Sequence, residues 1–348
     1  MRGGARVRNR KDRRGMADEG KQDSQDAAAT GTNMFENRLR KNAKRLRKWA
    51  RAQGLTAFRV YDRDIPEYSY AVDLYGDHAH VVEYPRRKAH AKGASTDSER
   101  AEVLAAVTAV LGVPAEKTSV KTHTPQPWGR SQYGRVGQGS ERLVVEEQGL
   151  KFWVNLGDYL DTGLFMDHRN TRARVRTEAK GKQFLNLFAY TGAFTVYAAA
   201  GGARGSVSVD LSNTYLDWAE DNLVLNGLAD PRHVLIRADA KAWLEDQARH
   251  GEDRYDLIVC DPPSFSTSKK MSGNFDVQRD HVRMLEHLQA LLSPGGVLYF
   301  STNYLGFELK DSATRGLEQV EELTPRSIPE DFHRKEIHRC WRMVAPSR

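Results

Sequence analysis

Residues 183–194 have the sequence QFLNLFAYTGAF, and this stretch decides the fold class of the chain. A short, mostly apolar strand at 183–188 enters a tight turn that ends at Gly192, and a helix is expected at 193–200. Strand, turn and helix in this order form the first part of a βαβ unit, in which parallel strands are joined by a crossover helix. The turn has one glycine instead of the three of G-x-G-x-x-G, which argues against a dinucleotide and favours a smaller nucleoside.

The alternation of strands and helices continues to the end of the chain. Apolar runs of strand length predict the strands 206–210, 233–237, 256–260, 297–302 and 337–344. Helical periodicity predicts the helices 214–226, 240–250 and 277–292 between them. The pattern is typical of a doubly wound, Rossmann-like α/β sheet, which we assign to a domain at 156–348.

Acidic residues follow three of these strands. Asp210 lies eighteen residues beyond Gly192, Asp239 ends the next strand, and Asp261 begins the sequence DPPSF. The carboxyl ends of parallel strands meet at one edge, where carboxylates can accept hydrogen bonds from ribose hydroxyls or an adenine amino group. Each residue alone is more often a helix cap or a turn residue, but the ordered set predicts an S-adenosylmethionine site.

The region before this domain has a different pattern. Residues 1–33 lack apolar periodicity and are expected to be a disordered basic tail, whereas 35–50 predict a basic amphipathic helix. Short strands at 57–61, 70–74, 78–84, 119–122, 143–147 and 152–155 surround a helix at 98–111. We therefore expect a smaller α+β accessory domain at 34–155, with a Gly-, Arg- and Gln-rich loop at 123–141 suited to unpaired RNA bases.

The charge distribution indicates a polyanionic partner. The chain has a formal net charge of +7, and residues 1–50 alone carry fifteen Lys or Arg against six Asp or Glu. Phosphate groups bind such cations through counterion release, although a solvated helix face explains the same pattern. The candidate RNA-binding residues on the predicted helix are Arg38, Lys41, Lys44, Arg45 and Lys48.

Other classes of protein are disfavoured. Cys260 and Cys340 lack the spacing of a zinc site or disulfide framework, so no metal is expected. No apolar run approaches the length of a membrane span, and the first thirty residues are too polar for a secretory signal, so a cytoplasmic location is expected. Met16 and Met34 are alternative starts of the protein.

Several motifs make the chain similar to one family of class I methyltransferases. The stretches YLDTGLFMDHR at 159–169, NLFAYTGAF at 186–194, DPPSF at 261–265 and NFDVQRDH at 274–281, together with Asp210, resemble the guanine-N7 methyltransferase of bacterial 23S rRNA. In many bacteria that enzyme is the C-terminal half of a fused two-activity protein, and the similarity covers 34–343. The resemblance implies a free-standing version that acts on domain V of 23S rRNA, near the peptidyl transferase centre and within an assembly intermediate.

The resemblance also implies roles for individual residues. Asp210 would bind the ribose, Asp239 the adenine, and Asp167 with Arg169 the amino and carboxylate ends of the methionine portion. Asp261 would orient the reacting groups, Pro262 and Pro263 would stiffen its loop, and Phe265 would stack on the target base. The remaining cofactor candidates adjoin these positions: Asn186, Phe188, Tyr190, Thr191, Gly192, Leu211, Ser212 and Ala240.

The chemistry of related reactions leaves two alternatives open. Cytosine-C5 methylation needs a thiolate, which would be expected after the strand at 297–302, where the chain has Ser301, Thr302 and Asn303 instead. Guanine-N2 methylation also uses Asn-Pro-Pro or Asp-Pro-Pro loops, so the motif does not exclude it. An RNA-binding ribosome-assembly factor without catalytic activity is the other alternative.

Overall fold

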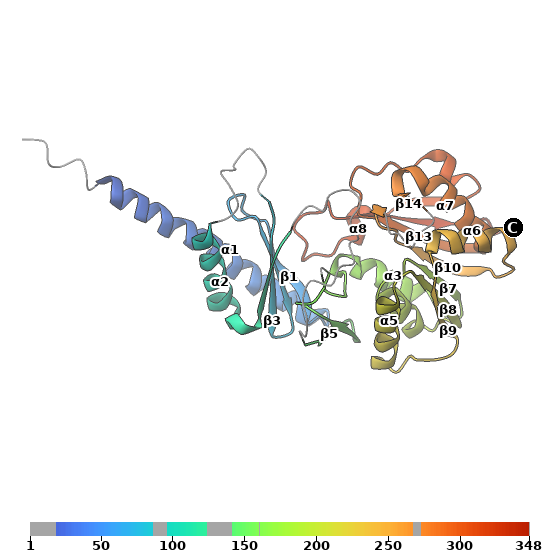
Figure 1. Ribbon diagram of the computed structural model, residues 1–348, viewed down its shortest axis with the longest axis horizontal. Helices are drawn as coiled ribbons and strands as arrows, with labels where there is room; N and C mark the ends of the chain where they lie inside the picture. Colours follow the sequence, from blue (N-terminus) through green and yellow to red (C-terminus); the bar gives the residue numbers. More distant parts are fainter. Residues whose placement is uncertain (1–18, 86–95, 124–140, 160, 267–272, 348) are drawn as a thin grey trace, which may run out of the picture.

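The structure is a computed structural model that describes residues 19–85, 96–123, 141–159, 161–266 and 273–347. Two β-sheets dominate it and lie side by side along the long axis of the molecule (Figure 1). The smaller sheet is formed by the N-terminal part of the chain and the larger one by the C-terminal part. No helix in the described part of the chain is both long and apolar enough to cross a membrane.

The larger sheet has seven strands. In spatial order they are β14 (Gln319–Glu322), β15 (Arg339–Val344), β13 (Leu292–Thr302), β10 (Tyr255–Cys260), β7 (Gln183–Leu187), β8 (Gly205–Asp210) and β9 (His233–Arg237). The five strands from β13 to β9 are parallel. At one edge β15 pairs antiparallel with β13, and β14 pairs antiparallel with β15. This confirms the predicted class I methyltransferase sheet. The strand β14 was not predicted, because its sequence QVEE has no apolar alternation.

Helices cover both faces of the seven-stranded sheet. The helices α6 (Ala240–His250) and α7 (Val277–Leu291) lie beside the sheet in Figure 1, and their buried side chains share one apolar core with it. The other face carries α3 (Arg169–Glu178), α4 (Ala193–Ala200) and α5 (Asn213–Leu225). This arrangement leaves the carboxyl ends of the parallel strands together at one edge, where a ligand can reach them.

The smaller sheet has the order β1 (Ala57–Asp62), β2 (Tyr70–Tyr75), β3 (His78–Glu83) and β4 (Thr118–Thr122). The helices α1 (Glu19–Ala52) and α2 (Asp97–Leu111) pack on it through a shared apolar cluster. In α1 the buried residues are those of the predicted apolar stripe: Phe35, Leu39, Ala43, Leu46 and Ala50. The periodic pattern therefore predicted which face of this helix is buried.

The helix α1 begins earlier than the sequence pattern indicates. Residues 19–33 were expected to belong to a disordered tail, but their backbone is helical and continuous with the rest of α1. Ala27, Ala28 and Ala29 are strong helix formers, but the segment also contains two glycines, so a helix that packing already holds further along is the main reason for the extension. Residues 1–18 and most of the loop 123–141 lie outside the described residues, so expectations for them, and the domain boundaries, stay predictions.

A hairpin connects the two halves of the molecule. It consists of β5 (Leu143–Glu147) and β6 (Leu150–Val154), and it packs against α4 and α5 in one apolar cluster. Phe152 stacks on Tyr197 with ring centroids 6.0 Å apart. The remaining short elements are β11 (Phe265–Ser266), β12 (Phe275–Asp276) and α8 (Thr324–Ser327). The hairpin thus joins the smaller sheet to the larger one by packing as well as by chain connection.

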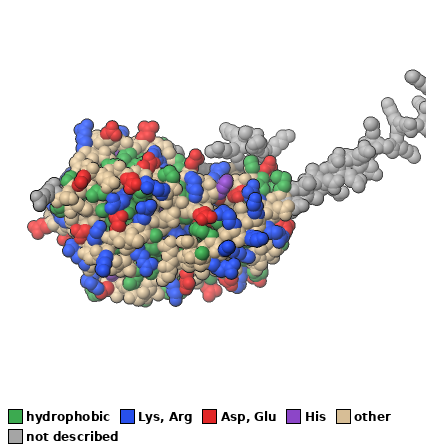
Figure 2. All heavy atoms as spheres, turned by 180° about the vertical axis from the view of Figure 1, so that it is seen from behind, with side chains coloured by type: hydrophobic (Ala, Val, Ile, Leu, Met, Phe, Trp, Pro, Cys, Tyr) green, Lys and Arg blue, Asp and Glu red, His purple; other side chains and the backbone are tan. Residues whose placement is uncertain are grey.

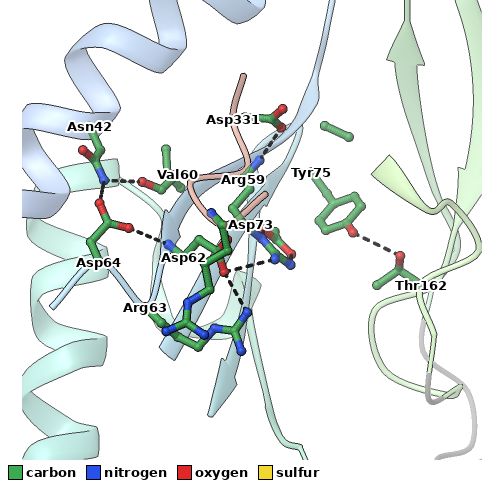
Figure 3. Close-up of polar contacts among 12 residues, drawn as sticks. Asn42, Arg59, Val60, Asp62, Arg63, Asp64, Asp73, Tyr75, Thr162 and Asp331 are labelled. Carbon is green, nitrogen blue, oxygen red and sulfur yellow. Dashed lines mark hydrogen bonds and ion pairs between the residues drawn. The ribbon is translucent and has the colours of Figure 1, made fainter. Parts of the chain in front are cut away.

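Polar contacts also join the smaller sheet to the C-terminal part of the chain. The backbone N–H of Arg59 donates to Asp331 Oδ2 at 3.0 Å, while its guanidinium pairs with Asp73 at 2.7 Å (Figure 3). On the same face of the sheet, Tyr75 Oη and Thr162 Oγ1 are 3.0 Å apart (Figure 3). These contacts fix the smaller sheet beside the segment 161–167, which carries several of the predicted site residues.

Candidate functional site

The turn after β7 is the most strained backbone segment at the ligand edge of the sheet. Phe188 and Tyr190 have φ values of 59° and 52°, which are unusual for residues with side chains, and Gly192 has 71°. The turn is held by hydrogen bonds from Ala189 N to Val209 O at 3.0 Å and from Tyr190 N to Asp210 Oδ2 at 2.9 Å. Such strain persists only when its surroundings enforce it, and it clusters at ligand sites.

Gly192 combines a left-handed backbone with a close contact. A Cβ at this position would lie 2.6 Å from Ala219 Cβ. Gly192→Ala is therefore expected to displace the turn and to lower the affinity for adenosylmethionine at least about 10-fold, because strain of about 1–2 kcal/mol adds to the clash. Isothermal titration calorimetry measures this affinity. The control is Gly227→Ala, where φ is 65° but nothing lies within 4 Å, and equal affinities of the two variants would contradict the prediction.

Asp210 lies at the end of β8 and faces the turn. Its two carboxylate oxygens accept hydrogen bonds from Tyr190 N and Ser212 N, both at 2.9 Å, and burial raises its pKa. Each carboxylate oxygen can accept more than one hydrogen bond, so a ribose could still be bound here. Ser212 caps α5 by accepting from Tyr215 N, and Leu211 joins the strand to this cap. The local structure therefore positions Asp210 while leaving acceptor capacity for a ligand.

Asp239 caps the helix α6. Its side chain accepts a hydrogen bond from Lys241 N at 3.0 Å, and the neighbouring Ala240 is buried. This capping bond occupies one carboxylate oxygen. It agrees with the alternative interpretation from the sequence, in which the aspartate is a helix cap. Since β9 adjoins β8, the carboxylates of Asp239 and Asp210 both lie at the ligand edge.

Two predicted cofactor residues lie behind the turn. Asn186 is buried and donates to Thr195 Oγ1 at 3.0 Å, and Thr191 is buried and donates to the carbonyl of Gly163 at 2.7 Å. These hydrogen bonds support the turn from below, and a contact of either residue with the cofactor stays a prediction.

Asp261 ends β10 and begins the DPPSF loop. Its Oδ1 accepts a hydrogen bond from Ser301 Oγ at 2.6 Å, so β13 orients it from the side. Pro262 is buried and Pro263 is half-buried, which agrees with a stiff loop. Phe265 is half-buried in β11, whose partner strand β12 lies directly before α7. The loop thus has a fixed geometry at the methyl-transfer side predicted from the sequence.

Two histidines, His168 and His338, form a cluster with the carboxylates of Asp167 and Asp261. His338 Nδ1 donates to Asp167 Oδ2 at 2.8 Å, and the rings of His338 and His168 stack with centroids 4.3 Å apart. His168 Nε2 lies 3.6 Å from Asp261 Oδ2 and 3.7 Å from Asp167 Oδ2. Neither histidine was singled out from the sequence. His338 lies 171 residues from Asp167, and only the fold brings the two together.

Burial dominates the electrostatics of this cluster. Burial lowers the pKa of His168 despite the nearby carboxylate of Asp261, so the imidazole is neutral at pH 7. Burial also opposes ionisation of Asp167, but His168, His338 and Arg172 together hold its pKa below the usual range. The site therefore presents carboxylate charge, which suits a cationic ligand group.

The same cluster offers ligand atoms that a metal ion could use. Asp167, His168 and His338 each place one such atom within 4.8 Å of the others. However, Asp167 Oδ2 already accepts from His338 Nδ1, and His338 Nε2 lies 2.9 Å from Ser327 Oγ. A hydrogen-bonded relay explains this geometry, and the expected absence of a metal stays a prediction.

Arg169 does not reach the cofactor edge, which corrects the sequence-based expectation. Its guanidinium is buried and donates to Glu147 Oε2 at 2.9 Å, Asp331 Oδ1 at 3.0 Å and the carbonyl of Ala57 at 2.8 Å. Arg172 donates to Glu147 Oε1 at 2.8 and 2.6 Å from the next turn of α3. Arg169 therefore joins the hairpin β5–β6, the smaller sheet and the segment around Asp331, and so fixes the adjacent Asp167 and His168.

The predicted RNA-binding residues all lie on the exposed face of α1. Figure 2 shows Lys and Arg side chains over the end of the molecule that carries α1 and the smaller sheet. Arg45 pairs with Glu330 at 2.5 Å, and a cavity of about 430 Å³ opens between this helix and the segment 330–335. The five predicted residues, Arg38, Lys41, Lys44, Arg45 and Lys48, are all exposed, as are Arg40 and Arg51 of the same helix.

Both cysteines are buried within the sheet. Cys260 and Cys340 are fully inaccessible, and burial raises the pKa of each thiol. A buried, protonated thiol is a poor nucleophile, which agrees with the argument against cytosine-C5 methylation.

Comparison with known proteins gives a consistent result. Residues 108–319 match the family model described as S-adenosylmethionine-dependent methyltransferase. The chain is 50% identical over 308 residues to ribosomal RNA large subunit methyltransferase K of Neisseria meningitidis, covering 88% of this chain and 86% of that protein.

Longer relatives and solved structures match as well. Ribosomal RNA large subunit methyltransferase K/L of Ectopseudomonas mendocina is 49% identical over 92% of this chain, but this chain spans only 43% of that protein. The crystal structure of the methyltransferase SMU.776, solved with SAH, has a TM-score of 0.73 at 24% identity over 90% of this chain and 82% of that one. The structural match supports the fold.

Proposed function

The chain belongs to the ribosomal RNA large subunit methyltransferase K family, and from this premise we propose that it methylates N7 of a guanine in 23S rRNA. It is an S-adenosylmethionine-dependent rRNA methyltransferase. The observation that supports the specific site most strongly is the strained turn 188–192, held by Asp210 at the edge where Asp239 and Asp261 also end strands. We place the target in domain V, reached in an assembly intermediate.

The residues at this edge fit the parts of adenosylmethionine. Asp210 would accept hydrogen bonds from the ribose, Asp239 from the adenine amino group, and Tyr190 with Gly192 would border the methionine portion. The carboxylates of Asp167 and Asp261 flank His168 and suit the cationic ammonium of the cofactor. When bound, adenosylmethionine supplies an electrophilic methyl group on a sulfonium.

The protein's contribution to the reaction is mainly positioning. Guanine N7 carries an in-plane lone pair and no proton, so a new N–C bond can form while the S–C bond breaks, without a general base. Asp261, fixed by Ser301, would orient the reacting groups, and Phe265 would stack on the base. His168 is buried and neutral. Its Nε2 lies near the carboxylates of both Asp261 and Asp167, and the ring would fix the distance between these two carboxylates.

The basic face of α1 would bind RNA phosphates. In the variant Arg38→Gln, Lys41→Gln, Lys44→Gln, Lys48→Gln, the slope of log K against log[salt] is expected to fall by about 3, because each phosphate contact contributes about 0.7–0.9. Arg45 is kept because it pairs with Glu330. Fluorescence anisotropy with a domain V fragment at several salt concentrations measures the slope.

The matched control neutralises four exposed cations of the methyltransferase part: Lys180, Arg254, Lys310 and Arg315. This variant carries the same change in net charge, so it accounts for long-range attraction. Equal slopes for the two variants would rule out a specific role of α1. The affinity for adenosylmethionine should stay unchanged in both.

The experiment that tests the reaction is methylation of unmodified 23S rRNA, both naked and within precursor particles. Borohydride reduction and aniline treatment cleave RNA at 7-methylguanine, so one new cleavage in domain V is the expected result. Methyl incorporation without cleavage would indicate guanine-N2 instead. No incorporation into either substrate would favour an RNA-binding assembly factor.

A further inference from the structure

A second cavity lies between the smaller sheet and the ligand edge of the larger one. Its volume is about 620 Å³, within the range of sites for small ligands or single nucleotides. One wall is formed by the smaller sheet, the other by the segment 161–167, and Asn303 lines it beyond the end of β13. Figure 3 shows Tyr75 of the sheet opposite Thr162 of this segment.

The cavity borders the candidate cofactor site. Phe165 and Asp167 line it, and the ring of Phe165 lies 4.9 Å from that of Tyr190 in the strained turn. Asn303 follows β13, whose Ser301 holds Asp261. A base that occupies this cavity would therefore lie beside the groups that border the methyl donor.

Asp161 is the carboxylate in this cavity that lacks a hydrogen bond. Among the described residues no group donates to it, and Lys121, whose Nζ donates to the carbonyl of Tyr159 at 2.5 Å, acts on it only at longer range. Burial raises the pKa of Asp161 to about 6. Asp161 is half-buried at the wall of the cavity, so its carboxylate is only partly solvated, and such groups are frequent where a ligand supplies the missing donors.

Guanine is the RNA base whose donors match a carboxylate. Its Watson–Crick edge has an N1–H and an N2–H side by side, and a carboxylate has two acceptor oxygens at a similar spacing. Adenine, cytosine and uracil do not have two adjacent donors on this edge. Binding by the Watson–Crick edge leaves N7, on the opposite edge of the purine, available to the methyl donor.

The remaining walls of the cavity suit the rest of a nucleotide. Lys121 provides positive charge for a phosphate, and the exposed ring of Phe165 provides an aromatic surface. Unpaired RNA bases are commonly bound by such a combination of stacking and hydrogen bonds to the base edge.

We propose that Asp161 is the specificity residue that binds the Watson–Crick edge of the target guanine in this cavity. The inference rests on the proposed function, since it specifies how the guanine substrate is recognised. It adds a residue on the segment 159–169 to which sequence analysis gave no individual role.

The test compares wild type with Asp161→Asn on RNA fragments that carry guanine or inosine at the mapped target. Inosine lacks the N2 amino group but keeps N7. The wild type is expected to bind the guanine fragment about 10–100-fold more tightly, because one hydrogen bond to a charged acceptor is lost with inosine. In Asp161→Asn the preference should fall below about 3-fold. Affinities are measured with S-adenosylhomocysteine present, so that no reaction is needed.

The matched control is Asp77→Asn. Asp77 is an exposed carboxylate between β2 and β3 of the smaller sheet, and it pairs with Lys117 away from the cavity. It should keep the guanine preference. Asp161→Asn should unfold at an equal or higher temperature, since it removes a buried charge, and it should bind adenosylmethionine normally. A stable Asp161→Asn variant that keeps the full preference would overturn the proposal.

Failure of the proposed N7 methylation can be distinguished from failure of the proposed role of Asp161. If wild-type product from the guanine fragment resists aniline cleavage, N7 is not the methylated atom. The affinity ratio still decides the role of Asp161, because it requires binding alone.

Discussion

Replacing Glu147 by Gln is expected to lower the free energy of unfolding by about 3–5 kcal/mol, the usual loss when one partner of a buried ion pair is neutralised. Glu147 is fully buried and accepts hydrogen bonds from both Arg169 and Arg172. Arg169 keeps Asp331 as a partner in the variant, whereas Arg172 keeps only the carbonyl of Phe165 among its described acceptors. The variant therefore leaves the buried Arg172 guanidinium without a hydrogen-bonded carboxylate, and only the longer-range charge of Asp167 remains.

Urea denaturation followed by circular dichroism measures this loss, with a decrease in melting temperature of about 10 °C as a second readout. The control is Glu178→Gln, whose carboxylate also pairs with an arginine, Arg342, but at a partly exposed position. Its loss should stay below about 1 kcal/mol. A Glu147→Gln variant as stable as the control would show that Glu147 does not hold the two halves together.

The difference between wild type and Glu147→Gln should depend on pH. Burial opposes ionisation of Glu147, but Arg172 and Arg169 outweigh it and hold its pKa below the usual range of a glutamate. A carboxylate with a lowered pKa in the folded state stabilises the protein above the pKa of the unfolded chain, and this contribution is lost as the pH falls through the folded pKa. The free energies of unfolding of wild type and Glu147→Gln should therefore differ fully at pH 7, and this difference should decrease as the pH falls below about 4.5.

Replacing Asp210 by Ala is expected to lower the affinity for adenosylmethionine by about 100-fold or more. Two hydrogen bonds from ribose hydroxyls to a carboxylate would be lost, each contributing about 1.5–3 kcal/mol. The turn would also lose the acceptor for Tyr190 N, which helps to hold a residue with a φ of 52°. Isothermal titration calorimetry gives the affinity directly, and methylation at saturating cofactor separates binding from rate.

The matched control for this prediction is Asp256→Ala. Asp256 also accepts a hydrogen bond from a backbone amide, Gln183 N at 2.8 Å, but it lies at the amino ends of the strands. Its loss should change stability without changing cofactor affinity. If Asp210→Ala bound the cofactor as tightly as wild type, the ribose would have to be placed elsewhere.

The sequence predicted the positions of the candidate site residues where the signal is local. The turn 186–194 and the residues Asp210, Asp239 and Asp261 each follow a strand directly, so the order of strands and helices placed them at one edge. The same local signal is ambiguous in the segment 159–169, which combines acidic and basic residues. Arg169 was interpreted there as a cofactor ligand, although it forms a buried ion pair.

The reason for that error is that composition does not distinguish two uses of a charged side chain. An arginine beside an aspartate suits a ligand carboxylate as well as a distant glutamate of the same chain. Glu147 lies 22 residues before Arg169, and Asp331 lies 162 residues after it. Only packing of the hairpin β5–β6 against α3 and α4 decides that these protein carboxylates are the partners.

By itself, the sequence of this protein determined the elements whose signals span a few residues: the strands of the parallel sheet, the turn ending at Gly192, and the buried stripe of α1. Backbone periodicity and turn geometry depend on neighbouring residues, so these features follow from local pattern. The tertiary structure alone decided which distant groups meet: His338 with Asp167, Glu147 with two arginines, and Asp161 with the smaller sheet. Burial and long-range pairing set the charge, hydrogen bonding and accessibility of these side chains, because they depend on how the whole chain packs.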